Sequence, residues 1–286
     1  MKTIAFIGTG IMGGHMAQRL LDAGYALRVY EKVKEKADEL VKSGAFYFDT
    51  LTGVVQGADA VISMLGYPSD VEEIYLGDGG LLYVAAPGTL LIDMTTSSPT
   101  LAKKIENVAK TKNLYALDAP VSGGEVGARS GSLSIMVGGE SAAYAMAEPL
   151  FSVMGKTITH CGSAGMGQNT KMSNQIAVSC NITAVAEAFA YALATGLNPQ
   201  TMFTCVSGGA GSSWQMNNMS GKMLNGDDAA GFYIRHLIKD MDIALSEAKA
   251  CGLELPLLTQ VRAIYGKLAD KGMENLGTQA VYYFYK

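Results

Sequence analysis

A short apolar run followed at once by a glycine-rich loop, close to residue 1, restricts the fold most strongly. Residues 3–7 (Thr-Ile-Ala-Phe-Ile) predict a buried strand, and the loop Gly8-Thr9-Gly10-Ile11-Met12-Gly13 follows it directly. A helix is expected over Met12–Ala23, because Gly24 stands in the usual place of the glycine that ends a helix. The order of strand, glycine loop and helix predicts the first unit of an α/β fold.

Strands and helices are predicted to alternate as far as residue 154. Further strands are expected at 26–30, 60–65, 89–93, 114–118 and 133–137, and helices at 34–41, 69–75, 99–110 and 141–154. Crossover helices between strands imply parallel pairing and a sheet covered on both faces. The pattern therefore predicts a doubly wound, mostly parallel sheet.

Near residue 160 this alternation ends. Residues 168–195 contain neither proline nor glycine, and one helix of 28 residues would be about 42 Å long. Its apolar residues do not form one narrow stripe, so we expect it to be buried on all sides, at a seam between domains or subunits. Only helices are predicted afterwards, at 199–206, 233–250 and 256–271. We expect an α/β domain over residues 1–163 and an all-α domain over 164–286, joined by the long helix.

Composition excludes several classes of protein. Hydrophobic residues make up 49 % of the chain and charged residues 17 %, which argues against disorder, and the net charge of −4 without basic clusters argues against nucleic-acid binding. The four cysteines are scattered and the three histidines are far apart, so we expect no disulfide framework and no metal site. No signal peptide or membrane span is predicted. A cytoplasmic protein is expected, and sparse surface charge favours a homodimer or homotetramer.

The glycine loop predicts a dinucleotide site. Its first glycine permits a tight turn, the second lets the backbone approach a pyrophosphate, and the third allows close helix packing. The helix N-terminus adds N–H donors and a positive dipole end. Ile11 and Met12, between these glycines, are included among the predicted contacts. The alternative is a tight turn with no ligand, since a chain with 34 glycines often contains this bare pattern.

Glu31 lies 23 residues after Gly8, at the predicted end of the second strand. A carboxylate there can accept hydrogen bonds from ribose hydroxyls and would repel a 2′-phosphate, which favours NAD over NADP. The neighbouring Lys32 favours NADP instead, because its ammonium could pair with that phosphate. A solvated charged turn is the alternative to both roles.

Two further segments carry candidate chemistry. The loop Val121-Ser122-Gly123-Gly124 follows a strand at the sheet's carboxyl edge, where its hydroxyl and amides could hold a substrate carboxylate, although a plain loop is an alternative. Lys171, Asn174 and Gln175 share one face of the long helix. Burial lowers the pKa of an ammonium toward the range of a general acid or base. A lysine that extends its ammonium to solvent from the helix end is the other interpretation.

Taken together, these segments resemble the β-hydroxyacid dehydrogenase family, which includes 3-hydroxyisobutyrate dehydrogenase and tartronate semialdehyde reductase. The resemblance covers essentially the whole chain and rests on five segments in order: Gly8-x-Gly10-x-Met12-Gly13, Asp93-Met94-Thr95-Thr96, Asp118-Ala119-Pro120-Val121-Ser122-Gly123-Gly124, Gly167-x-x-x-Lys171-x-x-Asn174-Gln175 and Lys239-Asp240. It implies a Rossmann domain, a long connecting helix and an all-helical domain.

The resemblance also implies residue roles. Lys171 would be the catalytic lysine, Ser122, Gly123 and Gly124 would hold the substrate carboxylate, and Gln175 or Asn174 would lie beside the reacting oxygen. Thr96 and Lys239 would contact the cofactor near its nicotinamide, and Leu65 would line the dinucleotide. Trp214, the only tryptophan, could cap the substrate pocket or serve in packing.

Three positions depart from the common family pattern. Many members carry Asn where this chain has Gln175, and NADP-using members usually carry Asn-Arg in place of Glu31-Lys32. The family's proline after Met-Leu is shifted, since Met64-Leu65 is followed by Gly66-Tyr67-Pro68.

The sequence as a whole predicts an NAD-preferring oxidoreductase, with NADP as an alternative cofactor. It would interconvert a small β-hydroxy acid and its semialdehyde, with hydride transfer to or from the cofactor. A reductase of tartronate semialdehyde, succinic semialdehyde or glyoxylate is the nearest alternative. A dinucleotide-binding module without turnover is the alternative from another class, and the presence of Lys171 argues against it.

Overall fold

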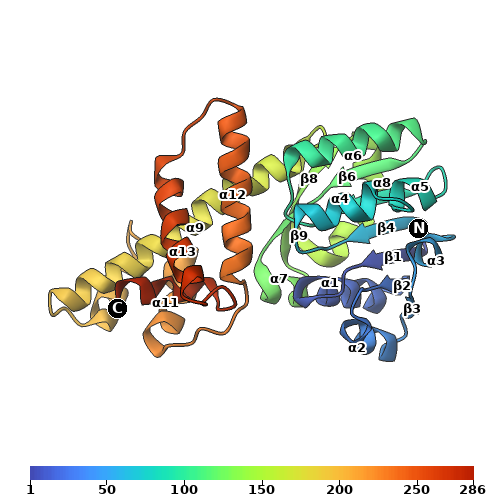
Figure 1. The fold of residues 1–286 in the computed structure, drawn as a ribbon. Helices are drawn as coiled ribbons and strands as arrows, with labels where there is room; N and C mark the ends of the chain where they lie inside the picture. Colours follow the sequence, from blue (N-terminus) through green and yellow to red (C-terminus); the bar gives the residue numbers. More distant parts are fainter. The chain divides into compact units, whose positions relative to one another are not determined.

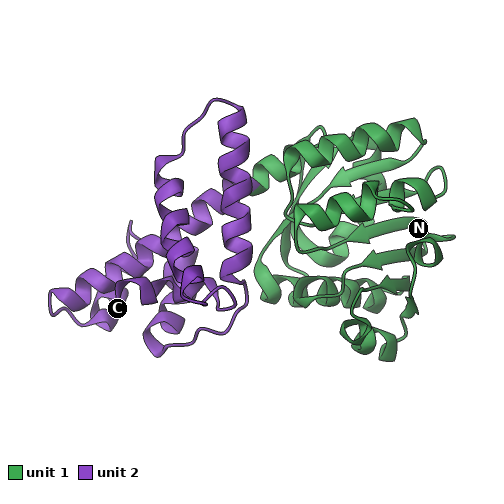
Figure 2. Ribbon diagram, viewed as in Figure 1, with its two compact units in different colours: residues 1–171 green, residues 172–286 purple.

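The computed structural model describes residues 1–286, which form two compact units, residues 1–171 and 172–286 (Figures 1 and 2). All strands belong to the first unit, and the second consists of helices and connecting loops. The predicted combination of a Rossmann-like domain with an all-helical domain is confirmed. The predicted boundary at residue 163 stays a prediction. The long helix α9 (Met166–Ala194) begins in the first unit and continues into the second.

A mostly parallel sheet forms the centre of the first unit. Its first six strands lie in the order β3-β2-β1-β4-β5-β6, all parallel, and are β1 (Thr3–Ile7), β2 (Ala26–Tyr30), β3 (Phe46–Phe48), β4 (Ala60–Ser63), β5 (Leu90–Asp93) and β6 (Tyr115–Asp118). Strand β8 (Leu133–Gly139) is antiparallel to β6 and to β7 (Val121–Ser122), and β9 (Gly155–Gly162) pairs parallel with β8. The loops after β4, β5 and β6 therefore meet at one edge of the sheet.

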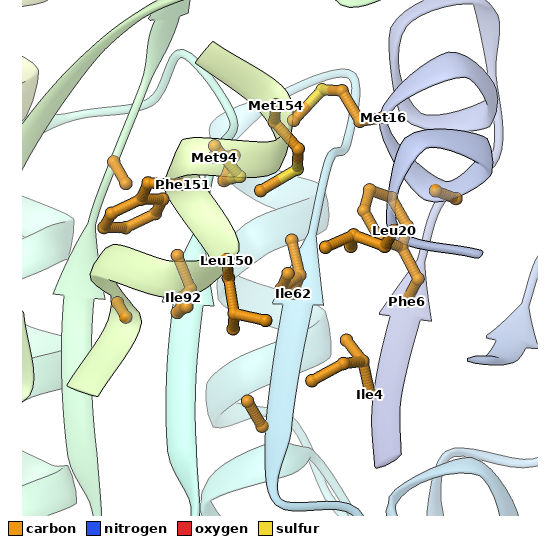
Figure 3. Close-up of a cluster of buried hydrophobic side chains, with 14 of the residues drawn as sticks. Ile4, Phe6, Met16, Leu20, Ile62, Ile92, Met94, Leu150, Phe151 and Met154 are labelled. Atoms are coloured by element: carbon orange, nitrogen blue, oxygen red, sulfur yellow. The ribbon is translucent and has the colours of Figure 1, made fainter. Parts of the chain in front are cut away.

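Apolar side chains cover both faces of this sheet. On one face, Ile4 and Phe6 of β1 pack with α1 (Ile11–Asp22) and α8 (Ser141–Met154), as Figure 3 shows. On the other face, Ala5 and Ile7 pack with α4 (Pro68–Leu76) and α6 (Pro99–Thr111). Successive residues of a strand point to opposite faces, so a continuous apolar strand supplies both cores. The remaining helices are short: the 3₁₀ helix η1 (Lys34–Ala37), α2 (Asp38–Lys42), α3 (Leu51–Val55), α5 (Leu81–Val84) and α7 (Gly124–Ser130).

Several elements of the first unit differ from the sequence-based prediction. Strands β3 and β7 and helices α3, α5 and α7 were not predicted, because each is too short to show a period. Strand β9 was not predicted either, since its exposed positions carry Lys156, Thr157 and Thr159, where a buried strand would carry apolar residues.

Helices α9, α10 (Pro199–Ser207), α11 (Trp214–Asn225), α12 (Ile234–Ala250) and α13 (Pro256–Asp270) build the second unit, with a C-terminal 3₁₀ helix η2 (Thr278–Tyr285). Its core includes Phe189 of α9, Met241 of α12 and Tyr265 of α13. Helix α11 was not predicted, because its Asn-Asn and Gly221 obscure the helical pattern. The Ser213 side chain accepts a hydrogen bond from the Met216 amide and begins this helix.

The prediction that α9 is buried on all sides is wrong for the single chain. Phe189 is fully buried, whereas Tyr191 is 72 % and Leu193 50 % exposed. By length and composition alone α9 could also cross a membrane, contrary to the expectation that no segment would. One face of α9 packs in the core of the second unit. The helix also carries five buried polar side chains: Gln168, Lys171, Gln175, Ser179 and Thr183. We therefore interpret α9 as a core helix.

Candidate active site

The glycine loop between β1 and α1 has no space for a side chain at two of its glycines and open space at a third. Gly8 has φ +88°, and a Cβ there or at Gly13 would overlap a backbone oxygen, that of Met64 or of Gly8 respectively. A Cβ at Gly10 would meet no atom within 4 Å. Gly10 therefore leaves an open approach to the N-terminus of α1. A glycine loop with this open approach fits the pyrophosphate of a dinucleotide. Ile11 is exposed there, and Met12 packs against the core.

Glu31 lies directly after β2, beside this loop. Its carboxylate accepts hydrogen bonds from the Thr9 amide at 2.8 Å and the Val33 amide at 3.3 Å. The Lys32 ammonium turns instead to Glu73 of α4, at 2.9 Å, and this hydrogen bond raises the pKa of Lys32. The geometry therefore places a carboxylate beside the glycine loop and partners the neighbouring ammonium with another acid.

Buried polar side chains join the loops after β4 and β5. The Asp93 carboxylate accepts from the Ser63 hydroxyl at 2.9 Å and from the Thr95 amide at 3.1 Å. The Thr95 hydroxyl in turn accepts from the Leu65 amide at 2.9 Å. Leu65 and the half-buried Thr96, both predicted cofactor contacts, therefore lie on loops that are tied to each other.

Gln168 fastens the second of these loops to α9. Its Oε1 accepts from the Ser97 amide at 2.9 Å, and its Nε2 donates to the Thr95 carbonyl at 2.7 Å. The side chain is fully buried. Backbone groups on both sides of Thr96 are thereby held by one side chain.

Asp118, the last residue of β6, caps the N-terminus of α9. Its carboxylate accepts from the Gly165 amide at 2.7 Å and from the Gln168 amide at 2.8 Å. Burial raises the pKa of Asp118 to about 6, although these two hydrogen bonds act in the opposite direction. A Cβ at Gly138 or Gly167 would fall within 3 Å of this carboxylate, so both glycines are needed for the helix to come so close.

Lys171 follows in the next turn of α9. Its side chain is only 6 % exposed, and Nζ donates to the Val121 carbonyl at 2.8 Å. Ser122 comes next and is half-buried, while Gly123 (φ +131°) and Gly124 (φ +60°) are exposed at the start of α7. The predicted catalytic lysine and the predicted carboxylate-binding loop are thus neighbours within the first unit.

The second unit holds the remaining predicted residues. The Gln175 Nε2 donates to Asp240 Oδ2 at 2.6 Å, and Gln175 Oε1 accepts from Asn174 Nδ2 at 2.7 Å. Lys239 forms an ion pair with Asp240 at 2.9 Å. Asp240 therefore gathers Gln175 and Lys239 around one buried carboxylate. Trp214, at the start of α11, is 60 % exposed, which argues against a packing role.

Comparisons with known proteins agree with these features. The model of the NAD-binding domain of 6-phosphogluconate dehydrogenase matches residues 3–162, and that of the NAD-binding region of NADP-dependent 3-hydroxyisobutyrate dehydrogenase matches residues 165–285. An uncharacterized oxidoreductase of Bacillus subtilis, YkwC, is 50 % identical over 281 residues, 98 % of each chain. An NAD-dependent L-serine dehydrogenase of Pseudomonas aeruginosa is 40 % identical, over 95 % of this chain and 94 % of its own.

A solved structure of Mycobacterium tuberculosis 3-hydroxyisobutyrate dehydrogenase with L-serine superposes with a TM-score of 0.91. It is 33 % identical and covers 99 % of this chain and 98 % of its own. The chain belongs to the β-hydroxyacid dehydrogenase family. It is an NAD(P)-dependent dehydrogenase that acts on CH–OH groups, as the sequence predicted.

For this β-hydroxyacid dehydrogenase, sequence reasoning missed the residues that hold the site in place. Asp118 and Asp240 were noted only as members of motifs, and Gln168 was given no role. An acid at the end of an otherwise apolar strand, as in Tyr115–Asp118, is a signal that could have pointed to Asp118.

The glycine loop yields a paired prediction. Gly13→Ala should lower the melting temperature, because its Cβ would overlap the Gly8 carbonyl oxygen. Gly10→Ala should leave the melting temperature unchanged but weaken NADH binding about tenfold or more, since the methyl group would occupy the open approach to the helix N-terminus. Thermal unfolding and NADH fluorescence titration measure the two effects. An unchanged NADH affinity for Gly10→Ala would place the pyrophosphate elsewhere.

The raised pKa of Asp118 predicts a pH dependence of stability. A carboxyl with a pKa of about 6 when folded and 3.8 when unfolded binds more protons in the folded state between these values. The stability that it contributes is therefore present below about pH 4 and is lost as the pH rises through 6, by up to about 3 kcal/mol.

Urea unfolding of the wild type and of Asp118→Asn at pH 4 to 7 tests this. The free energy of unfolding of the wild type minus that of the variant should fall over this range. Asp78→Asn, at an exposed acid, is the control. A difference that stays constant or rises with pH would show that Asp118 is not protonated as stated.

Proposed function

We propose that this enzyme is an NAD-preferring oxidoreductase that interconverts a small β-hydroxy acid and its semialdehyde, with Lys171 as general acid and base. The observation that carries the proposal is the buried Lys171 ammonium at 2.8 Å from the Val121 carbonyl, next to the exposed residues Gly123 and Gly124. A hydroxyl group bound beside a carboxylate site would come within reach of Nζ.

Each part of this arrangement has a separate task. The Ser122 hydroxyl and the amides of Gly123 and Gly124 bind the substrate carboxylate and orient the carbon chain. Lys171 takes the hydroxyl proton during oxidation and returns it to the carbonyl oxygen during reduction. The Val121 carbonyl occupies one N–H of the ammonium and fixes its direction. NAD, when bound, supplies hydride acceptance and donation. Asn174 and Gln175 are proposed to contact the substrate, with Trp214 at its pocket.

The named relatives narrow the substrate class. L-serine and 3-hydroxyisobutyrate, which appear in the names of similar proteins, share a carboxylate and a hydroxymethyl group on the α-carbon and differ only in the other substituent of that carbon. D-glycerate has the same skeleton. The Ser122–Gly124 loop and Lys171 would recognise the two shared groups, so we propose as substrate a β-hydroxy acid with a 3-hydroxypropanoate backbone and a small group on the α-carbon. Tartronate semialdehyde, succinic semialdehyde and glyoxylate remain the alternative substrates, in a reductase.

The preference for NAD rests on Glu31 and Lys32. A ribose that carries two hydroxyls can donate to the Glu31 carboxylate, whereas a 2′-phosphate would be repelled. Lys32 would have to leave its 2.9 Å contact with Glu73 before it could attract that phosphate. The other proposed cofactor contacts are Gly8, Gly10, Ile11, Met12, Gly13, Leu65, Thr96 and Lys239.

A cytoplasmic homodimer or homotetramer remains our proposal for the assembly. The exposed Tyr191 and Leu193 near the end of α9 favour burial against a second copy. No nucleic-acid or membrane partner is proposed.

The first test concerns Lys171. Lys171→Ala should lower kcat by roughly 10²–10⁴, because the proton then has no donor or acceptor. NADH affinity should stay within about twofold of the wild-type value, since the Gly8–Gly13 loop is unchanged. Lys171→Arg should recover little activity, because a guanidinium stays protonated.

The measurements are steady-state rates with 3-hydroxyisobutyrate, L-serine, D-glycerate and glycolate, and NADH titrations. Gln175→Ala is the matched comparison and should lose less activity, since an amide can only position the oxygen. If Lys171→Ala keeps more than about a tenth of wild-type kcat while chemistry limits turnover, Lys171 has no part in proton transfer.

The second test concerns cofactor preference. Glu31→Ser should raise the ratio of kcat/KM for NADP to that for NAD by about tenfold to a hundredfold, the effect of one charged hydrogen bond of roughly 1–3 kcal/mol. Glu148→Ser, at an exposed acid on α8, should leave the ratio unchanged. A wild-type enzyme that favours NADP tenfold would mean that Lys32 decides the preference.

A further inference from the structure

Three buried side chains connect the loops after β4, β5 and β6 with the first turn of α9. The Thr95 hydroxyl holds the Leu65 amide, the Gln168 amide group holds both sides of Thr96, and the Asp118 carboxylate holds the start of α9. None of the three belongs to the Gly8–Gly13 loop, and none is the proposed general acid and base, Lys171. Their contacts nevertheless join the loop of a proposed nicotinamide contact, Thr96, to the helix of Lys171.

Each terminal oxygen or nitrogen atom of the Asp118 and Gln168 side chains makes a hydrogen bond to the backbone. The two oxygens of Asp118 take one backbone amide each, from Gly165 and from Gln168. The Gln168 side chain uses its oxygen on the Ser97 amide and its nitrogen on the Thr95 carbonyl. The amide of Gln168 suits this place, because it accepts at one end and donates at the other, which an ionised carboxylate cannot do. Gln168 is thus bound through its backbone to β6 and through its side chain to the loop after β5.

We infer that Asp118 and Gln168 are positioning residues for the reaction, which hold the first turn of α9 in one register so that Lys171 Nζ stays at the Val121 carbonyl. This inference rests on the proposed role of Lys171 in proton transfer. Lys171 lies three residues after Gln168, less than one helical turn. A shift of that turn would therefore move Nζ almost as far as it moves Gln168.

The effect of such a shift falls on kcat. A misplacement of about 1 Å at a reacting group can cost about 10²-fold in rate. Neither side chain belongs to the glycine loop or to the Ser122–Gly124 loop, so binding of cofactor and substrate should change little. A general loss of fold would instead reduce binding and rate together.

Asp118→Asn and Gln168→Glu are the variants of choice, because each keeps the size of the native side chain. Asn at 118 places an amide NH2 group against one of two backbone N–H groups. An ionised Glu at 168 cannot donate to the Thr95 carbonyl, so the Gln168→Glu variant is assayed at pH 8 or above. Each should lower kcat about tenfold to a hundredfold, with KM for the hydroxy acid and the Kd of NADH within about threefold of wild type.

A Lys171→Ala background separates positioning from other roles. If Asp118 and Gln168 act through Lys171, adding either substitution to Lys171→Ala should change the residual rate by less than about threefold. Asn198→Ala is the matched control, since it removes a side chain that accepts from the Gln200 and Thr201 amides at the start of α10. It should lower the melting temperature and leave kcat unchanged.

Three results would overturn the inference. The first is a kcat within threefold of wild type for a folded Asp118→Asn or Gln168→Glu variant. The second is a full additional loss of rate in the Lys171→Ala background, and the third is a parallel loss of NADH binding. If Asp118→Asn does not fold, Gln168→Glu, which keeps the bond from Ser97, decides alone. An active Lys171→Ala enzyme would refute the proposed function itself, whereas an inactive Lys171→Ala enzyme beside an active Gln168→Glu enzyme would refute only this inference.

Discussion

The hydrogen bonds between the Asp118 carboxylate and the first turn of α9 determine where this helix starts, and with it the place of Lys171. The first amides of any helix lack partners within the helix, and the Gly165 and Gln168 amides belong to buried residues at the start of α9. A carboxylate satisfies two of these amides and complements the positive end of the helix dipole. Its burial is costly, which raises the pKa of Asp118 to about 6. The structure accepts this cost at the point where sheet and helix meet.

Glycine makes this contact sterically possible. Gly138 on β8 and Gly167 on α9 face the same carboxylate, and a methyl group at either would fill the space that it occupies. The strand ends and the helix can therefore approach closely enough for Lys171 to reach the Val121 carbonyl. One edge of the sheet thus carries both the Gly8–Gly13 loop and the Lys171 ammonium, the edge where open α/β sheets commonly bind ligands.

The fold was largely predictable because its signals are local. The strands at Thr3–Ile7 and Ala26–Tyr30 and the helix at Ser141–Met154 have the predicted bounds, since apolar runs and glycines mark them directly. Helix α7 and strand β9 were not predicted, because glycine-rich or half-exposed segments carry no clear period. The exposed face of α9 was missed for another reason: composition shows that a helix is apolar, but not which of its sides a single chain covers.

The candidate site was predictable only in part. The residues that would touch cofactor or substrate lie in recognisable segments, such as Gly8–Gly13 and Ser122–Gly124. The partners of buried polar groups depend on which loops meet in space, so the roles of Gln168 and Asp118 became visible only in three dimensions. The sequence alone also left open whether Lys32 would pair with a 2′-phosphate, because its partner Glu73 lies on a helix 41 residues further along the chain.

We propose that Lys171 transfers the proton of a β-hydroxy acid whose carboxylate lies on the Ser122–Gly124 loop. A crystal structure with NAD and 3-hydroxyisobutyrate or L-serine tests it most directly. Lys171 Nζ should lie within about 2.6–3.2 Å of the substrate hydroxyl, and the carboxylate should contact the Gly123 and Gly124 amides. A substrate hydroxyl bound by other groups, with Nζ more than about 5 Å away, would show that Lys171 does not transfer this proton.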